Sequence, residues 1–268
     1  MRSRVALLLA LGALTLSALS QDTFSAPTEP GQSARAPKPA AAPSAQSAVV
    51  PAAFRTPPSV QAAPRPARRS IFGVARLGGP LALHTRPRGP VSSTLSAATE
   101  FGSPRVVSVA ARRGRWLGVV TTALPNNRLG WVRRDDPAVR AARVGYSLRA
   151  DLSERSLELR RDGRVIKRLS VAVGRPGSPT PTGRFAVTDK LRGTSYGPYY
   201  GCCILALSGH QPNTPPGWTG GDRLAIHGTD APATLGQPAS AGCLRAADAD
   251  LQMLMRRVPL GTPVFING

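Results

Sequence analysis

The chain is poor in cysteine, histidine and aromatic residues. Its 268 residues include three cysteines and three histidines, which are not spaced as zinc ligands are. No glycine-rich phosphate loop opens a helix, so we expect neither a metal nor a cofactor. Aromatic residues make up 5% of the chain, and aromatic ribonucleoprotein strands, paired CxxC motifs and basic heptads are all missing. These absences exclude the common nucleic-acid-binding modules.

The N-terminus carries the one long apolar run. Arg2 and Arg4 precede an apolar segment over 5–19, which is shorter than the roughly 20 residues of a membrane span. A small-x-small cleavage pattern ends at Ser20. We therefore expect a signal peptide over 1–20 and export to the cell wall, the periplasmic space or the medium. An uncleaved signal anchor is the alternative.

Acidic residues are scarce as well. Asp and Glu number 14 against 35 Lys and Arg, which gives a net charge of +21. Such a balance predicts an anionic partner. For an exported chain without a nucleic-acid motif, we expect anionic cell-wall polymers or a membrane surface. A compositional bias toward alanine and arginine is the alternative.

Export would place the three cysteines in an oxidising compartment. Their number is odd, so at least one thiol is free or pairs between molecules. Cys202 and Cys203 are sequence neighbours and are either free or joined in a vicinal disulfide. Cys243 is then the candidate reactive thiol.

Two β-rich segments follow a linker. Residues 21–70 are rich in Pro, Ala, Ser and Gln and predict an extended linker. Residues 71–136 hold short strand-like runs between tight turns and a Gly-Trp-Val close, and they resemble a bacterial SH3-like domain. Trp116 and Trp131 are expected in its core, with a platform for wall peptide or glycan as the alternative.

Residues 145–268 predict the second β-rich unit. Apolar residues alternate at period two over 146–152 and 156–160, which leads into a hairpin turn at 161–164, and 165–173 continues as a long strand. One helix is expected after Cys243, with Asp248 as its N-cap and arginines in its last turn. His210 is expected in a loop.

A histidine and a cysteine lie beside glycines in this second unit. His227 ends a strand-like run before Gly228, and Cys243 follows Gly242. An imidazole beside a thiol favours the nucleophilic thiolate, and the amides of Gly242 and Cys243 could stabilise an oxyanion. The alternative is a structural histidine and a small buried cysteine.

Short motifs surround these residues in a fixed order. They are Val-Gly-Arg-Pro at 173–176, Thr-Pro-Thr-Gly-Arg-Phe at 180–185, Tyr-Gly-Pro at 196–198, Ile-His-Gly-Thr at 226–229, Leu-Gly-Gln-Pro at 235–238 and Ser-Ala-Gly-Cys-Leu-Arg at 240–245. Over residues 145–268 the chain thereby resembles the L,D-transpeptidase catalytic domain, also called the YkuD domain. The resemblance implies a mainly β fold, a β-sandwich-like catalytic domain with one helix after the cysteine, here preceded by the small SH3-like barrel.

The resemblance also implies a peptidoglycan acyltransferase that acts on stem peptides. Cys243 would attack the bond between a diamino acid and D-Ala, D-Ala would leave, and an amine of another stem would resolve the thioester into a 3→3 cross-link. His227 would be the base and later the acid, and the Gly228 carbonyl would orient its ring. The Gly242 and Cys243 amides would form the oxyanion hole.

Three further residues join the expected site. Ser240 begins the cysteine motif and belongs to the oxyanion and substrate-binding set. Arg245 would anchor substrate or brace the cysteine loop, with a surface ion pair as the alternative. Tyr196 would help to wall the donor pocket, with an ordinary core tyrosine as the alternative.

One position departs from the family pattern. Ala241 stands where the family usually has a histidine, as Ser-His-Gly-Cys. Because the pattern assigns the base to His227, we expect activity. An L,D-carboxypeptidase, in which water resolves the thioester, and a catalytically inactive cell-wall binding protein are the alternatives. Nothing in the sequence argues against a monomer.

Overall fold

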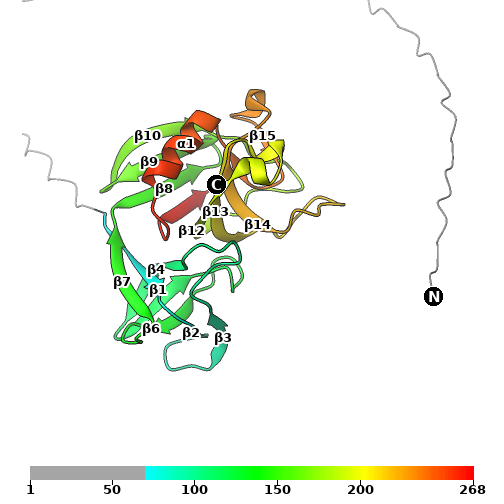
Figure 1. The fold of residues 1–268 in the computed structure, drawn as a ribbon. Helices are drawn as coiled ribbons and strands as arrows, with labels where there is room; N and C mark the ends of the chain where they lie inside the picture. The colour runs from blue at the N-terminus through cyan, green and yellow to red at the C-terminus, as the bar shows by residue number, and fades with distance from the viewer. Residues whose placement is uncertain (1–69) are drawn as a thin grey trace, which may run out of the picture. The chain divides into compact units, whose positions relative to one another are not determined.

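The computed structural model describes residues 70–268. The predicted signal peptide, and all of the predicted linker except Ser70, lie outside the described residues. The described residues belong to one compact unit. Within the described part the fold is mainly β with a single α-helix, as predicted (Figure 1).

The first seven strands form one antiparallel sheet, coloured cyan to green in Figure 1. They are β1 Phe72–Leu77, β2 Leu81–His84, β3 Val91–Leu95, β4 Val106–Arg113, β5 Trp116–Val120, β6 Gly130–Arg133 and β7 Val139–Val144. Their order in the sheet is β3-β2-β6-β5-β4-β1-β7. Alternation along β5 sends Leu117 and Val119 into a buried cluster, with Leu83 and Val132 from neighbouring strands. Strand β7 lies beyond the predicted 71–136 segment, and the likeness of this sheet to an SH3-like barrel stays a prediction.

A second, eight-stranded sheet carries the remaining core. Its strands are β8 Tyr146–Asp151, β9 Ser156–Arg161, β10 Arg164–Ser170, β12 Gly183–Arg192, β13 Cys203–His210, β14 Arg223–His227, β16 Leu244–Arg245 and β17 Pro263–Asn267. Their order is β10-β9-β8-β17-β12-β13-β14-β16. The pairs β8–β17 and β14–β16 are parallel, and the others are antiparallel.

Short elements complete the second unit. They are the parallel pair β11 Val173–Gly174 and β15 Pro238–Ser240, and the 3-10 turns η1 Gly193–Ser195, η2 Pro198–Tyr200 and η3 Pro232–Thr234. Strand β13 ends at His210, so the expected loop position of that histidine is wrong.

The helix α1, Asp248–Arg257, buries Leu251 and Leu254 in the second core and packs against β13 and β14. Its N-cap is Ala247, without a side-chain cap, and Asp248 is the first helical residue. The predicted N-cap is therefore wrong by one position. The Asp248 carboxylate instead accepts hydrogen bonds from other segments, as described below. No helix in the described part of the chain is long and apolar enough to cross a bilayer.

Candidate active site

His227 is the last residue of β14, and its side chain is fully buried. Its Nδ1 lies 2.7 Å from the Gly228 carbonyl oxygen. Because a carbonyl only accepts, Nδ1 carries the proton and Nε2 keeps a free lone pair. Nε2 is buried and has no hydrogen-bond partner among the described residues. The strand end thus holds a neutral imidazole whose basic nitrogen is unused.

Cys243 lies in the turn between β15 and β16, and Ser240 fixes that turn. The Ser240 hydroxyl donates to the Cys243 carbonyl at 2.6 Å and accepts from the Gly242 N–H at 3.0 Å. Gly242 has a φ of +117°, a conformation that favours glycine. Since the Gly242 N–H is engaged by Ser240, the Cys243 N–H is the member of the predicted oxyanion pair that remains.

Strand pairing brings the cysteine turn beside the histidine strand. In the parallel pair β14–β16, Ile226 lies opposite Leu244 and His227 opposite Arg245. Continuing this register puts Cys243 beside Ala225, two residues before His227. Ala225 and His227 point to the same face of β14, about 6.5 Å apart along the strand.

No hydrogen bond joins the Cys243 thiol to the His227 imidazole in the described part of the chain. The Cys243 thiol donates instead to the Arg223 carbonyl, with 3.8 Å between sulfur and oxygen. Cys243 also lines a small cavity of about 40 Å³ together with Tyr199, Tyr200 and Trp218. The rings of Tyr199 and Tyr200 cover His227, with centroid distances of 5.5 and 4.9 Å.

Burial favours the neutral forms of both His227 and Cys243 at pH 7. Loss of hydration lowers the pKa of His227 to about 4, although the Gly228 carbonyl acts in the opposite direction. The same cause raises the pKa of the Cys243 thiol to about 11, against the backbone at Ala225 and the charge of Arg245. The two pKa shifts therefore favour a neutral thiol and a neutral imidazole over a preformed thiolate–imidazolium pair.

Comparison with known proteins matches this half of the chain to one family. A family model described as the L,D-transpeptidase catalytic domain, YkuD, matches residues 145–266. YkuD of Bacillus subtilis (strain 168) is 32% identical over 126 residues, which are 46% of this chain and 67% of that protein. The chain belongs to the L,D-transpeptidase catalytic domain family.

Further relatives match the same part of the chain. The YkuD protein of Bacillus licheniformis is 31% identical over 124 residues, which are 46% of this chain and 67% of that protein. Among solved structures, L,D-transpeptidase 3 from Mycobacterium tuberculosis is 17% identical and aligns with a TM-score of 0.38. The alignment covers 52% of this chain and 74% of that one.

Arg245 of the L,D-transpeptidase domain is buried, with 7% of its surface exposed. Its Nη2 donates to the Tyr199 hydroxyl at 2.5 Å, and its guanidinium lies 4.3 Å from the centre of that ring. No carboxylate pairs with it among residues 70–268, and its Nε is buried without a partner. The surface ion pair considered from the sequence is therefore wrong, and an unpaired buried cation lies beside the Cys243 turn.

Tyr196 lies at the edge of the site and not in its wall. It is 47% exposed, packs edge-on against Phe101 and Tyr200, and does not line the cavity that holds Cys243. The core alternative for Tyr196 is therefore wrong as well. Tyr199 and Tyr200 take the walling position, three and four residues further on, because η2 turns them over His227. The two adjacent tyrosines at 199–200 are the sequence feature that could have indicated this role.

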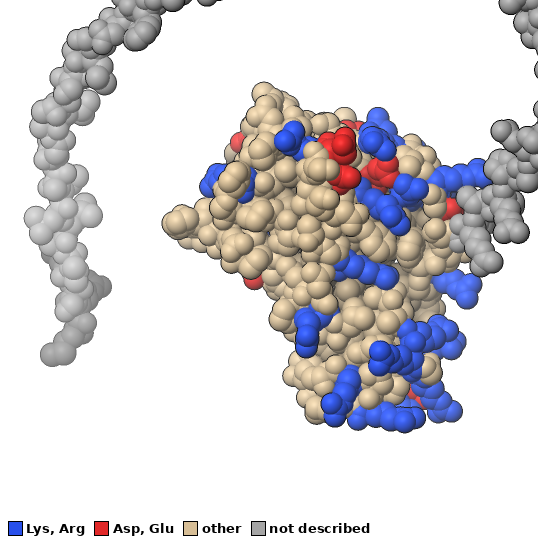
Figure 2. Space-filling model, turned by 180° about the vertical axis from the view of Figure 1, so that it is seen from behind, with Lys and Arg blue, Asp and Glu red and all other residues tan. Residues whose placement is uncertain are grey.

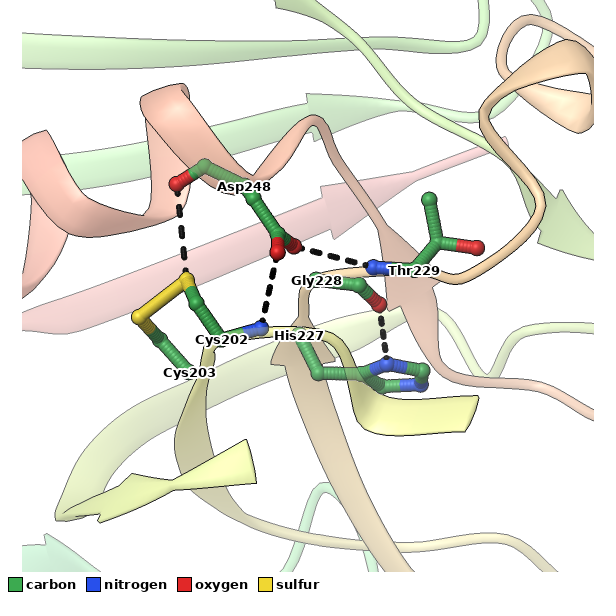
Figure 3. The surroundings of a disulfide bond; sticks show 6 residues. All are labelled: Cys202, Cys203, His227, Gly228, Thr229 and Asp248. Carbon is green, nitrogen blue, oxygen red and sulfur yellow. Dashed lines mark hydrogen bonds between the residues drawn. A yellow bond between two sulfur atoms is a disulfide. The ribbon is translucent and has the colours of Figure 1, made fainter. Parts of the chain in front are cut away.

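Asp248 braces the histidine loop from behind (Figure 3). Its two carboxylate oxygens accept from the backbone N–H groups of Cys202, at 3.0 Å, and Thr229, at 3.2 Å. Cys202 and Cys203 are joined in a disulfide, and the Gly228 N–H donates to the Cys203 carbonyl at 3.0 Å. The strand end that orients His227 is thus tied to α1 and to the disulfide segment. Sequence reasoning missed this role because it assigned the carboxylate to its own helix.

Gln211 is a second residue that the sequence did not single out. It is buried, and its Nε2 lies 3.0 Å from both the Pro179 and the Ala241 carbonyl oxygens. It therefore joins the Pro- and Gly-rich loop before β12 to the cysteine turn. Nothing in the local sequence marks a glutamine for this role, since both partners are distant backbone groups.

Proposed function

We propose that the chain is a cysteine-dependent peptidoglycan L,D-transpeptidase in which Cys243 is the nucleophile and His227 the base. The observation that carries the proposal is the free, buried Nε2 of His227, held in its tautomer by Gly228 and placed one strand away from Cys243. Family membership supports the reaction class. The substrate would be a stem tetrapeptide with a diamino acid before its terminal D-Ala.

Acylation begins with a proton transfer from Cys243 sulfur to His227 Nε2. The sulfur attacks the carbonyl carbon of the diamino acid, and the tetrahedral oxyanion faces the Cys243 N–H. The carbon–nitrogen bond to D-Ala breaks, and the leaving amine takes the proton back from His227. A thioester and free D-Ala result. The Gly228 carbonyl stabilises the transient imidazolium through Nδ1.

Resolution uses the same two residues in reverse. The side-chain amine of a second stem attacks the thioester and gives a proton to His227, which returns it to the departing sulfur. The product is a 3→3 cross-link. The rings of Tyr199 and Tyr200 limit the access of water to His227, which favours an amine over water as the acceptor.

The substrate requires the site to open. A cavity of about 40 Å³ is too small for a peptide end. The loop over it, around Trp218, contains Gly217, Gly220 and Gly221, and the Trp218 indole N–H bonds within that loop, to Gly221. We therefore expect this loop to move away from Tyr199 when a stem peptide enters.

Intact-mass measurement after incubation with a tetrapeptide muropeptide or a carbapenem tests the proposal. We expect a covalent adduct on the wild type and none on Cys243→Ala. For His227→Gln we expect acylation slowed by about 10²- to 10⁴-fold. Analysis of the muropeptide products then separates 3→3 cross-linking from L,D-carboxypeptidase trimming. A folded wild-type protein that forms no adduct would instead be the inactive wall-binding protein.

A further inference from the structure

A second, larger cavity lies on the first sheet, outside the L,D-transpeptidase domain. It is open, has a volume of about 690 Å³, and is lined by Arg88, Arg113, Arg115, Arg133 and Trp116, together with one proline and one glycine. The reaction proposed above uses none of these residues. The lining therefore combines four positively charged guanidinium groups with one indole ring.

Strand pairing fixes the floor of the cavity. Arg113 of β4 lies opposite Trp116 of β5, and Trp116 lies opposite Arg133 of β6. Residues paired in this way project from the same face of a sheet. The row Arg113–Trp116–Arg133 is therefore set by backbone register. The core residues Leu117 and Val132 alternate to the other face.

His84 holds the loop that brings Arg88 to the cavity. The His84 Nδ1 lies 2.8 Å from the Gly89 carbonyl oxygen, and a Gly89 N–H bond to the Arg86 carbonyl closes the turn. The His84 ring packs edge-on against Trp116, with 4.9 Å between centroids. One side chain thus links the Arg88 loop to the indole on the floor.

The positive charge around the cavity is only partly neutralised. Asp135 pairs with Arg133 at 2.8 Å and with Arg115 at 3.4 Å, and the hydrogen bond from Arg133 lowers the pKa of Asp135 to about 2. Neither Arg88 nor Arg113 has a carboxylate partner in the described part of the chain. The lower part of Figure 2, which is the region of the first sheet, shows blue side chains gathered with few red ones between them.

We infer that this cavity binds a wall polymer of sugars or polyols joined by phosphodiesters. Arginine forks match phosphate oxygens, and an indole face packs against the carbon skeleton of a sugar or polyol. The lining contains none of the exposed large hydrophobic residues that would enter a bilayer, and this argues against a membrane surface as the ligand. The inference rests on the expected export of the chain to the cell wall and not on the proposed enzyme activity.

Binding of synthetic poly(glycerol phosphate) to the full chain, measured by calorimetry at two salt concentrations, tests the inference. We expect the double variant Arg88→Gln/Arg113→Gln to bind about tenfold more weakly or worse. The matched control Arg256→Gln/Arg257→Gln removes two exposed arginines of α1, and we expect its affinity to fall less than about threefold. We expect Trp116→Leu to weaken binding of poly(glycerol phosphate) but not of inorganic polyphosphate, which has no carbon skeleton.

Three outcomes would overturn the inference. Equal losses in the two double variants would mean a general charge effect. An unchanged affinity in Arg88→Gln/Arg113→Gln would mean that the cavity is not the site. Binding to phosphatidylglycerol vesicles that exceeds polymer binding, and that falls in the same variant, would mean a membrane ligand. All variants should show the wild-type melting temperature, and the measurements can be repeated in Cys243→Ala, so the enzyme proposal can fail separately.

Discussion

His227 is fully buried, and its imidazole is favoured in the neutral form. Both properties follow from its position at the end of β14, inside the second core. The strand carries the ring into the second core, and Tyr199 and Tyr200 close over it. A charged imidazole would lose its hydration there, so protonation is disfavoured. Of the two ring nitrogens, only Nδ1 regains a hydrogen bond in place of water, and its partner is the Gly228 carbonyl.

The burial of His227 makes stability depend on pH in a defined window. The pKa falls from an ordinary 6.5 to about 4 on folding, so the unfolded chain takes up a proton that the folded chain does not. The contribution of neutral His227 to the free energy of unfolding is complete above pH 6.5 and is lost as the pH falls toward 4. It amounts to about 3 kcal/mol. Urea unfolding of wild type and His227→Gln at pH 7.5 and 4 measures it.

The wild type should lose about 3 kcal/mol more than His227→Gln between these two pH values. Other titrating groups are common to both proteins and cancel in the comparison. Equal losses in the two proteins would show that His227 titrates normally and is not buried as described.

Residue roles could be predicted from the sequence where a motif fixes a backbone contact. The resemblance to the family implied the contact between His227 and the Gly228 carbonyl, and the contact is present. The walling tyrosine could not be predicted, because the choice between Tyr196 and Tyr199 depends on how η2 turns. The burial of Arg245 was also beyond the sequence, since it depends on the ring of Tyr199.

At the scale of elements, the cysteine turn depends on one glycine and one glutamine. Gly242 has a φ of +117°, and a Cβ there would overlap the Gln211 amide. That amide cannot move freely, because it already bonds to the carbonyls of Pro179 and Ala241. The turn thus leaves no room for a side chain.

Gly242→Ala should lower the free energy of unfolding by more than about 2 kcal/mol and abolish adduct formation. Gly236→Ala is the matched control: its φ is +80°, but the nearest atom to its Cβ is the Ser170 hydroxyl at 3.3 Å. For Gly236→Ala we expect the free energy of unfolding to fall by about 1 kcal/mol, from backbone strain alone. Denaturant unfolding and intact mass measure both variants, and similar effects in the two would refute the packing argument.

Elements with regular alternation were predictable, and short connecting elements were not. Period-two patterns predicted β8 and β9, and the apolar run that continues after the hairpin turn predicted β10, of which Leu169 is the buried residue. The two-residue strand β16 shows no period, yet it sets the register of the site. The helix start was misplaced because the Asp248 carboxylate bonds to Cys202 and Thr229 rather than to its own helix.

At the scale of the whole molecule, the two sheets are joined by polar contacts. Asn126, in the loop before β6, donates to the His210 carbonyl at 2.7 Å and accepts from the His210 N–H at 2.9 Å. Thr99 donates to the buried Asp189, and Arg223 pairs with Glu100. Arg223 begins β14, so these contacts reach the strand that ends at His227.

Removing the Asn126 amide should destabilise the whole described unit. Asn126→Ala leaves two backbone groups of His210 without partners, which costs about 2 kcal/mol. We expect thermal unfolding to stay a single transition at a lower temperature. Gln237→Ala, which removes one exposed local bond to Ala233, should change stability by less than about 0.5 kcal/mol. Two separate transitions in Asn126→Ala would mean that the sheets fold independently.

The bond between Cys202 and Cys203 bears on which thiol of the chain stays free. The two cysteines occupy each other's sulfur atoms in the folded chain. Each is then unavailable to the third thiol, Cys243, which stays reduced. Neither sulfur of that bridge is left to oxidise the third one, so the candidate nucleophile is the sulfhydryl that has no partner within the chain.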